Sequence, residues 1–310
     1  AEKAGHFTLI QRTPNWVLGR HSVLPILPKE QTPWWMVWIF SNIPGAMRLY
    51  RNVLLALIDS LLWPSKVLHR DGFMKRVFER FGRNEMAMTL KQKPELLEKS
   101  MPEMRIGCKR ICFADDYLKA LVRDNVHVLK TGVARIVEDG VITSEGEHIP
   151  ADVLIYATGF DVGSIGRTKI QGTTTCVEGR SAADDGLEAY LGISVVGMPN
   201  SFMLLGPNTT LAHNSLIRMI EAQVAFMVRT MVEAIDNDVE CFDIKPQIVE
   251  EYNSKLQSVF KDRVWSYGGC SSWYLNKNGK VFVLWPNTTF MFHRIANQAS
   301  SLQKAFNTRM

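Results

Sequence analysis

The stretch that decides the fold is ADVLIYATGFD, residues 151–161. Its apolar run, Val153 to Ala157, carries no charge and ends in Thr158-Gly159. Such a run is typical of a strand buried on both faces, as in a parallel α/β sheet. A Thr-Gly pair after a strand lets the backbone approach a ligand closely, because glycine has no side chain. The pattern therefore predicts a buried strand that leads into a ligand-facing corner.

A second apolar run, SFMLLGPN at residues 201–208, has the same form and ends in Gly206-Pro207. It precedes a helix predicted over residues 214–234, with Asn214 as its N-cap. In open α/β sheets, ligands bind beyond the carboxyl ends of the strands, and a helix N-terminus favours phosphate or an electron-rich ring. An ordinary α/β crossover without a ligand explains the same pattern equally well.

The composition is that of a globular protein of one large domain or two ordinary ones: 310 residues, 46% hydrophobic and 22% charged. The formal charge of +5 suits an anionic ligand such as a phosphorylated cofactor, and no basic run indicates nucleic acid. The five cysteines are scattered, and no histidine cluster completes a zinc site. We expect a cytoplasmic protein that holds no metal.

Residues 34 to about 99 are predicted to be helical. The runs WWMVWIF and VLLALIDSLLW are strongly apolar, but neither is long enough to span a bilayer. The Trp34–Trp63 region has three alternative interpretations: a buried helical insertion, which we favour, a pair of helices on a membrane surface, or a lid over an apolar substrate.

Two pairs of neighbouring residues, each with an arginine, are candidate site residues. Arg12-Thr13 follows a short predicted strand, His6 to Ile10, and an arginine beside a hydroxyl suits a 2′-phosphate. Lys109-Arg110 lies in a predicted loop, where an arginine that always stays charged can stabilise an oxyanion. For both pairs, a solvated surface position is the alternative. His213 is the histidine nearest a predicted corner, and a structural role suits it better than a catalytic one.

Five segments occur in the order found in flavin-dependent Baeyer–Villiger monooxygenases: QRTPNW, GCKRI, YATGFD, FMLLGPN with IEAQV downstream, and SSWY. They lie along nearly the whole chain, from residue 11 to residue 274. ATGFD is shared with N-hydroxylating and S-oxidising flavin monooxygenases, whereas QRTPNW and GCKRI are more specific to the ketone-oxidising branch. The chain therefore resembles this family, whose members are α/β flavoproteins with two dinucleotide-binding, Rossmann-like domains.

The resemblance implies how NADPH and the substrate would be bound. Arg12 and Thr13 match the pair that holds the 2′-phosphate of NADPH, and Lys109 matches a second phosphate contact. Arg110 matches the active-site arginine. Trp273, in SSWY, matches a tryptophan that packs on the nicotinamide cofactor.

The resemblance also implies where the two cofactor domains join. Thr158, Gly159, Phe160 and Asp161 match the hinge between the NADP domain and the FAD domain. Leu216 matches a position whose backbone faces the flavin. Together these matches imply FAD and NADPH as cofactors.

The implied reaction is a Baeyer–Villiger oxidation. NADPH reduces FAD, O2 then forms a flavin peroxide, and the peroxide converts a ketone to an ester or lactone. Arg110 would supply a fixed positive charge near the reacting oxygens. The apolar insertion suggests a bulky, apolar ketone such as a terpenoid, steroid or polyketide. An N- or S-oxygenating flavin monooxygenase and a non-catalytic binding or scaffold protein are the alternatives.

The chain departs from the family in its glycine motifs. Family members carry a GxGxxG loop for FAD, a fingerprint around a histidine and a tryptophan, and a second GxGxxG for NADP, and none of these occurs in the 310 residues. We therefore expect the C-terminal portion of the fold. Residues 1–150 would be the rest of the NADP domain, with the helical insertion at about 28–100, and residues 151–310 the rest of the FAD domain.

Three explanations account for this departure. The chain is a fragment of a complete monooxygenase, which we favour, or one piece of a split enzyme whose partner chain supplies the missing strands. The third explanation is a decayed remnant reused for binding. Because the missing segments include a central strand of each nucleotide domain, we expect the chain alone to be an incomplete catalyst.

Overall fold

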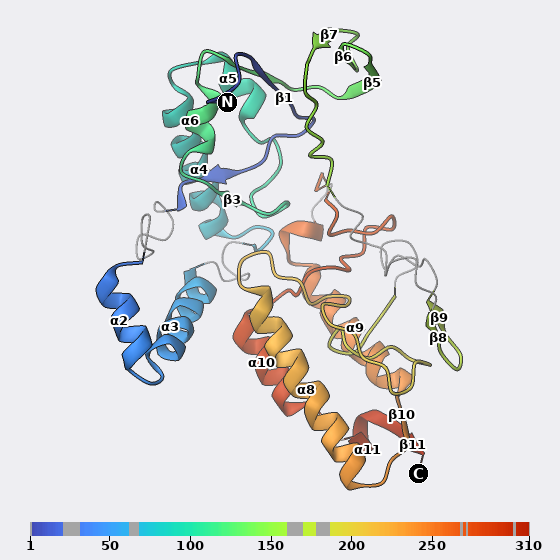
Figure 1. Cartoon of the computed structure of the whole chain (residues 1–310). Coiled ribbons are helices and arrows are strands. Elements are labelled where there is room, and N and C mark those ends of the chain that lie inside the picture. Colours follow the sequence, from blue (N-terminus) through green and yellow to red (C-terminus); the bar gives the residue numbers. More distant parts are fainter. Residues whose placement is uncertain are drawn as a thin grey trace. The chain divides into compact units, whose positions relative to one another are not determined.

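The computed structural model describes residues 2–20, 32–61, 68–159, 170–177, 187–266, 269–270, 272–299 and 302–309 (Figure 1). The chain divides into two compact units. The first comprises Ala1–Ile43 and Arg76–Phe160, and the second comprises Pro44–Lys75 and Asp161–Met310. Each unit therefore contains part of the predicted helical insertion.

The first unit combines short strands with helices, as the predicted α/β class requires. Its helices are α2 (Trp34–Asn42), most of α4 (Phe73–Leu90), α5 (Glu95–Ser100) and α6 (Tyr117–Leu121). Its strands are β1 (Phe7–Ile10), β2 (Val17–Leu18), β3 (Cys112–Phe113), β4 (Val126–Leu129), β5 (Val133–Val137), β6 (Gly140–Thr143) and β7 (His148–Pro150).

The pairing of these strands joins distant parts of the sequence. β1 runs parallel to β4, and β2 runs parallel to β3. β5, β6 and β7 form an antiparallel three-stranded meander. Gly140 opens β6 where a Cβ atom would lie 2.1 Å from the carbonyl oxygen of Ile149, so only glycine fits there. The strand predicted before Arg12, His6 to Ile10, is confirmed as β1.

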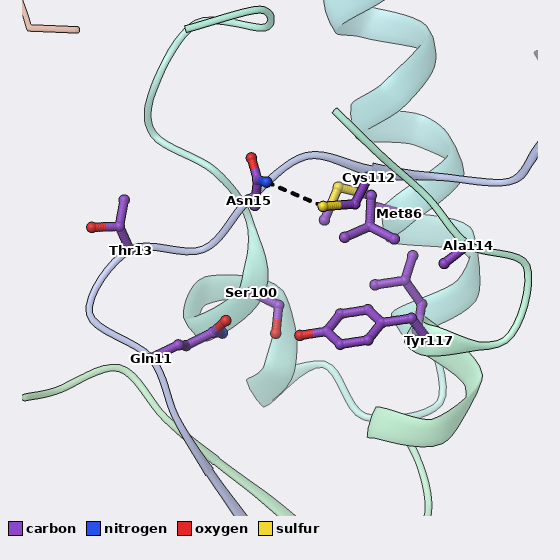
Figure 2. Close-up of a pocket in the computed structure, with 10 residues that line it drawn as sticks. Gln11, Thr13, Asn15, Met86, Ser100, Cys112, Ala114 and Tyr117 are labelled. Carbon is purple, nitrogen blue, oxygen red and sulfur yellow. Dashed lines mark hydrogen bonds between the residues drawn. The ribbon is translucent and has the colours of Figure 1, made fainter. Parts of the chain in front are cut away.

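The core of the first unit is built around Trp16, which is fully buried. The Trp16 Nε1 donates a hydrogen bond of 3.0 Å to the carbonyl oxygen of Met104, so the ring is buried without an unpaired polar atom. Arg83 stacks on the Trp16 ring at 5.2 Å from its centre. Met86 of α4 and Ala114, one residue after β3, line a pocket of this unit (Figure 2).

The second unit is mainly helical. Its helices are α3 (Ala46–Leu61), α8 (Leu216–Asp236), α9 (Pro246–Phe260), the 3-10 helix η1 (Val264–Ser266), α10 (Thr289–Gln298) and α11 (Leu302–Ala305). Its strands are β8 (Ile170–Gln171), β9 (Cys176–Val177), β10 (Cys241–Ile244) and β11 (Phe306–Arg309), which form two antiparallel pairs. The helix predicted at residues 214–234 is confirmed as α8.

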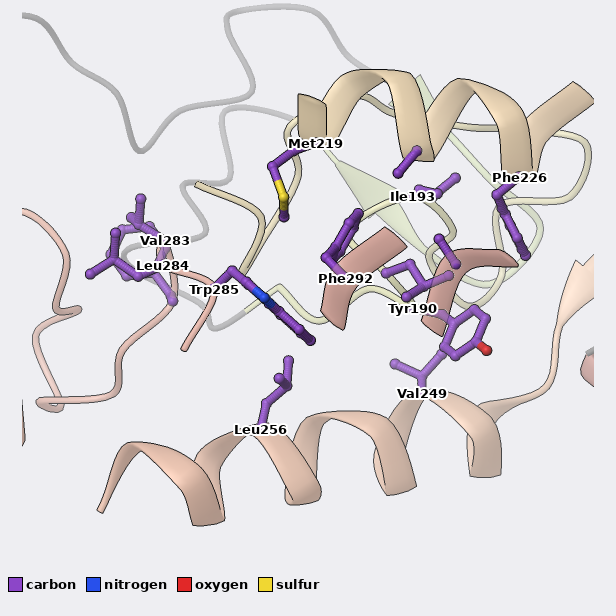
Figure 3. Packing of buried hydrophobic residues seen from close by; sticks show 14 of the residues in the cluster. Tyr190, Ile193, Met219, Phe226, Val249, Leu256, Val283, Leu284, Trp285 and Phe292 are labelled. Atoms are coloured by element: carbon purple, nitrogen blue, oxygen red, sulfur yellow. The ribbon is translucent and has the colours of Figure 1, made fainter. Parts of the chain in front are cut away.

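A large apolar core holds the second unit together (Figure 3). α8 contributes Met219 and Phe226, and α10 contributes the fully buried Phe292. Trp285 meets Phe292 edge to face, with ring centres 5.2 Å apart. The Trp285 Nε1 donates to the carbonyl oxygen of Thr288, which leaves its buried polar atom satisfied.

The buried strand predicted at Val153 to Ala157 is wrong. These residues form irregular backbone, and Val153 and Ile155 are 74% and 80% exposed. A strand exists only where a neighbouring strand pairs with its backbone groups, and no such neighbour occurs among the described residues. The apolar composition alone therefore does not produce the strand.

The second predicted buried strand, at residues 201–208, is wrong as well. Leu205 and Asn208 have positive φ values of 52° and 59°, which turn the backbone instead of extending it. Side-chain hydrogen bonds hold this shape: the Leu205 N–H donates to the Gln223 side chain, and the Asn208 side chain donates to the carbonyl oxygens of Val281 and Leu284. Residues 201–208 therefore form a loop that these hydrogen bonds hold in place.

The burial predicted for the helical insertion is wrong for α2. None of its residues is buried, and Trp34 is 81% exposed. Among the residues that the structure describes, no helix is both long enough and apolar enough to cross a membrane.

We expect Trp16→Ala to destabilise the first unit by about 3–5 kcal/mol, because a fully buried aromatic ring and its hydrogen bond are lost. Amide hydrogen exchange in β1 and β4, measured in increasing urea, reports the loss. The matched control is Trp35→Ala on α2, where a half-exposed ring is removed and a change within about 0.5 kcal/mol is expected. Equal effects of the two substitutions would contradict the assigned core.

Candidate functional site

The first unit brings together the segments of residues 11–16 and 107–112, which contain QRTPNW and GCKRI. The Cys112 N–H donates to the carbonyl oxygen of Trp16 at 2.8 Å, and the Ala114 N–H donates to that of Leu18 at 2.9 Å. These bonds flank the parallel pair β2–β3. Arg12-Thr13 and Lys109-Arg110, which are far apart in the sequence, therefore lie on adjacent segments.

Asn15 fastens the two segments with its side chain. The Asn15 Nδ2 donates to the carbonyl oxygen of Arg110 at 2.8 Å and to the Cys112 Sγ at 3.2 Å, the second contact being dashed in Figure 2. The Asn15 Oδ1 accepts from the Trp16 N–H at 2.9 Å. Because the amide makes all three contacts at once, its orientation is fixed, and so is the backbone at Arg110.

A pocket of about 240 Å³ opens beside these segments. Its lining residues are Gln11, Thr13, Asn15, Val17, Met86, Ser100, Cys112, Ala114, Tyr117 and Leu118. Figure 2 shows the Tyr117 ring pointing toward Ser100. The Ser100 Oγ is buried and makes no hydrogen bond within the described part of the chain. The pocket thus combines apolar walls with an unused hydroxyl, as small-molecule sites commonly do.

The predicted phosphate-binding residues lie at the rim of the first unit. Arg12 and Thr13 are exposed, and Thr13 lines the pocket. Lys109 is partly exposed and Arg110 is exposed. The aliphatic part of the Arg12 side chain passes Gly132, where a Cβ atom would lie 3.8 Å from it. All four residues are therefore accessible to a ligand in solution.

The predicted hinge is only partly described. Thr158 and Gly159 are exposed, and Gly159 has a φ of +92°, which residues with a side chain rarely adopt. The glycine corner predicted from the sequence is therefore present, although the strand before it is not. Phe160 and Asp161 lie outside the described residues.

The two remaining predicted residues belong to the second unit. Trp273 is half exposed, and its ring packs against that of the buried Tyr274, with ring centres 4.8 Å apart. Leu216 is the first residue of α8 and is partly buried against the core. The N-cap of α8 is Ser215, so the predicted cap at Asn214 is wrong by one residue. The Asn214 Oδ1 instead accepts from the Ser215 N–H at 2.8 Å.

The Tyr117 hydroxyl, which lines the pocket, is neutral. Burial raises the pKa of Tyr117, and the nearby Cys112 raises it further, so the hydroxyl stays protonated and able to donate. On the surface of the same unit, the Lys130 ammonium hydrogen-bonds Glu103 and lowers the pKa of that carboxyl. The described residues contain no group of three or more histidine, cysteine or acidic side chains that could hold a metal.

Sequence reasoning missed four residues of this pocket: Gln11, Asn15, Ser100 and Tyr117. The Gln11 Nε2 donates to the carbonyl oxygen of Lys99 at 3.1 Å, which ties the segment to the end of α5. Gln11 and Asn15 lie inside QRTPNW, on either side of Arg12 and Thr13. Their side-chain amides can form hydrogen bonds, so the sequence could have indicated them as site residues. Ser100 and Tyr117 lie in helices whose sequences give no indication of a site.

Comparison with known proteins identifies relatives along almost the whole chain. A protein named Baeyer-Villiger monooxygenase from Streptomyces coelicolor is 31% identical over 304 residues, which cover 94% of this chain and 54% of the relative. A protein of the same name from Pseudomonas aeruginosa is 32% identical over 300 residues, 94% of this chain and 53% of the relative. The chain belongs to the Baeyer–Villiger monooxygenase family. It spans about half the length of these relatives.

Solved structures of this family have the same fold. A steroid monooxygenase in its oxidised state with NADP bound superimposes with a TM-score of 0.73 at 21% identity, covering 99% of this chain and 63% of that one. The monooxygenase OTEMO in complex with FAD and NADP gives a TM-score of 0.74 at 19% identity, covering 99% and 62%. The predicted fold class, that of a two-dinucleotide-domain flavoprotein, is confirmed. No protein-family model matches the chain.

We expect Asn15→Asp to loosen residues 107–112, because the carboxylate has no N–H for the Arg110 carbonyl oxygen but can still accept from Trp16. Loss of such a bond costs about 1–3 kcal/mol, so amide exchange in this segment is expected to become about tenfold faster or more. Mass-spectrometric hydrogen exchange measures the rate. Asn84→Asp, an exposed position on α4, is the control and should leave the segment unchanged.

Proposed function

We propose that this chain is part of a monooxygenase that uses FAD, NADPH and O2 to convert a bulky, apolar ketone into an ester or lactone. The observation that carries the proposal is the joining of the segments of residues 11–16 and 107–112 through β2, β3 and Asn15. Membership of the Baeyer–Villiger family supports it. Within it, residues 1–150 would belong to the NADP domain and residues 151–310 to the FAD domain.

The residues of the first unit fit NADPH. Arg12, Thr13 and Lys109 present two cations and a hydroxyl at accessible positions, which is the chemistry that holds a 2′-phosphate. Ser100 and Tyr117 line the adjoining pocket, and their hydroxyl groups could form hydrogen bonds with polar atoms of the ligand. Trp273 of the second unit offers a half-exposed ring face for the nicotinamide.

The residues of the second unit fit one end of FAD. α8 is 21 residues long, and its N-cap Ser215 makes no side-chain capping bond. The N–H groups of the first turn, at Leu216, have no partner within the helix itself and could face an electron-rich ring. When bound, the flavin supplies the transfer of electrons from NADPH to O2. Thr158, Gly159, Phe160 and Asp161 would form the hinge between the two cofactor domains.

Arg110 is the proposed catalytic residue. Its guanidinium is a cation, and its side chain is exposed in the first unit. The hydrogen bond from Asn15 to its carbonyl oxygen holds the backbone from which the side chain extends. A fixed cation at this place would stabilise negative charge that develops on the ketone oxygen during the reaction.

The proposed substrate is a ketone of large apolar surface. Trp34, Trp35 and Trp38 of α2 are all half exposed or more, and they give the protein an apolar surface of the kind that such a substrate would contact. One solved structure with this fold is described as a steroid monooxygenase, which agrees with a bulky ketone. Contact of the same helix with a membrane surface is the other proposal for these side chains.

We expect Arg12→Ala to weaken NADPH binding by about tenfold or more, because a charge-assisted bond to the 2′-phosphate is lost. Binding of NADH, which lacks that phosphate, should be unchanged. Fluorescence titration of the chain with both nucleotides measures the ratio of their dissociation constants. Arg135→Ala, an exposed arginine on β5, is the matched control and should leave the ratio as it is. An unchanged ratio in Arg12→Ala would contradict the proposed phosphate site.

We expect Arg110→Ala to lower ester formation from ketones strongly, while NADPH consumption continues, when the complete monooxygenase of which this chain is proposed to be part is supplied with FAD, NADPH and O2. Removal of one such charge-stabilising group typically lowers the rate by about 100- to 1,000-fold. Gas chromatography of the ester and absorbance at the NADPH band separate the two quantities. Sulfide oxidation by the same variant is the second readout: if both oxidations are lost equally, Arg110 serves cofactor binding and not ketone activation.

A further inference from the structure

The second unit contains a buried carboxylate to which sequence reasoning gave no role. Asp59, near the end of α3, is only 8% exposed and accepts hydrogen bonds from four groups. On Oδ1 the donors are the Asn214 Nδ2 at 2.8 Å, the His213 Nε2 at 3.2 Å and the Thr289 Oγ1 at 3.3 Å. On Oδ2 the donor is the Phe290 N–H at 3.3 Å.

These contacts bring three separate segments to one group. Asp59 belongs to α3, His213 and Asn214 directly precede α8, and Thr289 and Phe290 begin α10. The N-termini of two helices therefore meet a single negative charge, which their dipoles favour. Burial by itself raises the pKa of Asp59, but hydrogen bonds from His213 and Asn214 outweigh it, so the pKa lies below its usual range. The carboxyl is thus ionised at neutral pH.

An ionised carboxylate only accepts hydrogen bonds, so the His213 Nε2 must carry a proton in this contact. The His213 side chain is 5% exposed, which leaves its ring little freedom to turn away. Asp59 therefore determines both the direction of the imidazole and the nitrogen that holds the proton, as a carboxylate does for histidines in many sites.

Asp59 also acts on α8 through Asn214. Since the Asn214 Nδ2 donates to Asp59, its Oδ1 is turned toward the Ser215 N–H, which it accepts at 2.8 Å. Ser215 is the N-cap of α8, and its own side chain makes no capping bond. The orientation of the first turn of α8 thus depends on Asp59 of α3, which lies 155 positions before Asn214 in the sequence.

We propose that Asp59 is a positioning residue that holds the proton of His213 on Nε2 and fixes the start of α8. The importance of this end of α8 for the reaction rests on the proposed function, in which the backbone at Leu216 faces the flavin. Of the other charged groups near the pair, Glu221 is already engaged, because it accepts from Arg51 at 3.0 Å and from Arg218 at 2.7 Å. The ring of His293 also interacts electrostatically with Asp59, but its Nε2 makes no hydrogen bond within the described residues. Asp59 is therefore the carboxylate assigned to His213.

The test is an NMR measurement on the 310-residue chain with ¹⁵N-labelled histidine and phenylalanine and without flavin. In the wild type, the His213 ring N–H should be visible and should exchange slowly with solvent, with His213→Gln providing the assignment. Asp59→Ala should remove that signal and speed exchange of the Phe290 amide by about tenfold or more. A wild-type His213 ring N–H that exchanges as fast as those of exposed histidines overturns the proposal.

Asp59→Asn separates positioning from a merely structural role. An asparagine at position 59 keeps one oxygen, which can face the three donors of Oδ1, but it turns an NH2 group toward the Phe290 N–H. The His213 signal should therefore be retained while the Phe290 amide exchanges faster. Retention of both or loss of both overturns the proposal, and this holds even if Asp59→Ala fails to fold.

The matched control is Asp236→Asn, the same substitution at the exposed opposite end of α8. It should leave the His213 ring N–H and the Phe290 amide as in the wild type. Because the measurement contains no flavin and no NADPH, its failure leaves the nucleotide-binding test of the proposed function standing, and failure of that test leaves this one standing.

Discussion

The parallel pairing of β2 with β3 is the constraint on which the organisation of the first unit depends. Two backbone hydrogen bonds, from Cys112 to Trp16 and from Ala114 to Leu18, join segments about 95 residues apart. Two side chains beside β2 add to this pairing: Trp16 is fully buried, and Asn15 donates to the carbonyl oxygen of Arg110. The basic residues can serve one ligand only because this pairing places their segments next to each other.

The same requirement for partners explains which predicted strands are absent. A helix satisfies its backbone within its own sequence, so α8 appears close to where its pattern predicts it. A strand needs a neighbour, and Val153 to Ala157 have none among the described residues. Residues 201–208 are held by side-chain hydrogen bonds and not by a neighbouring strand. The Gln223 side chain accepts from the Leu205 N–H, and the Asn208 side chain donates to the carbonyl oxygen of Val281.

Two kinds of polar contact organise the two units. In the first unit, a neutral amide, Asn15, fixes a loop that carries two cations. In the second, a charged group, Asp59, gathers the beginnings of two helices and a histidine. A buried polar group such as Asp59 costs free energy unless its hydrogen bonds are matched, so it specifies one arrangement more strongly than apolar packing does. Both lie next to residues to which the family resemblance assigns cofactor contacts.

The sequence alone determined the family, the order of its motifs and most helices, because motif identity and helical periodicity are local properties of the chain. It also located the glycine corner at Gly159, since a positive φ favours that residue type. Only the tertiary structure decided that Asn15 fastens Arg110, that Asp59 pairs with His213 and that α2 lies exposed. Hydrogen bonds between segments 95 or more residues apart, and burial against a core, depend on how the chain is folded back on itself, which no local pattern records.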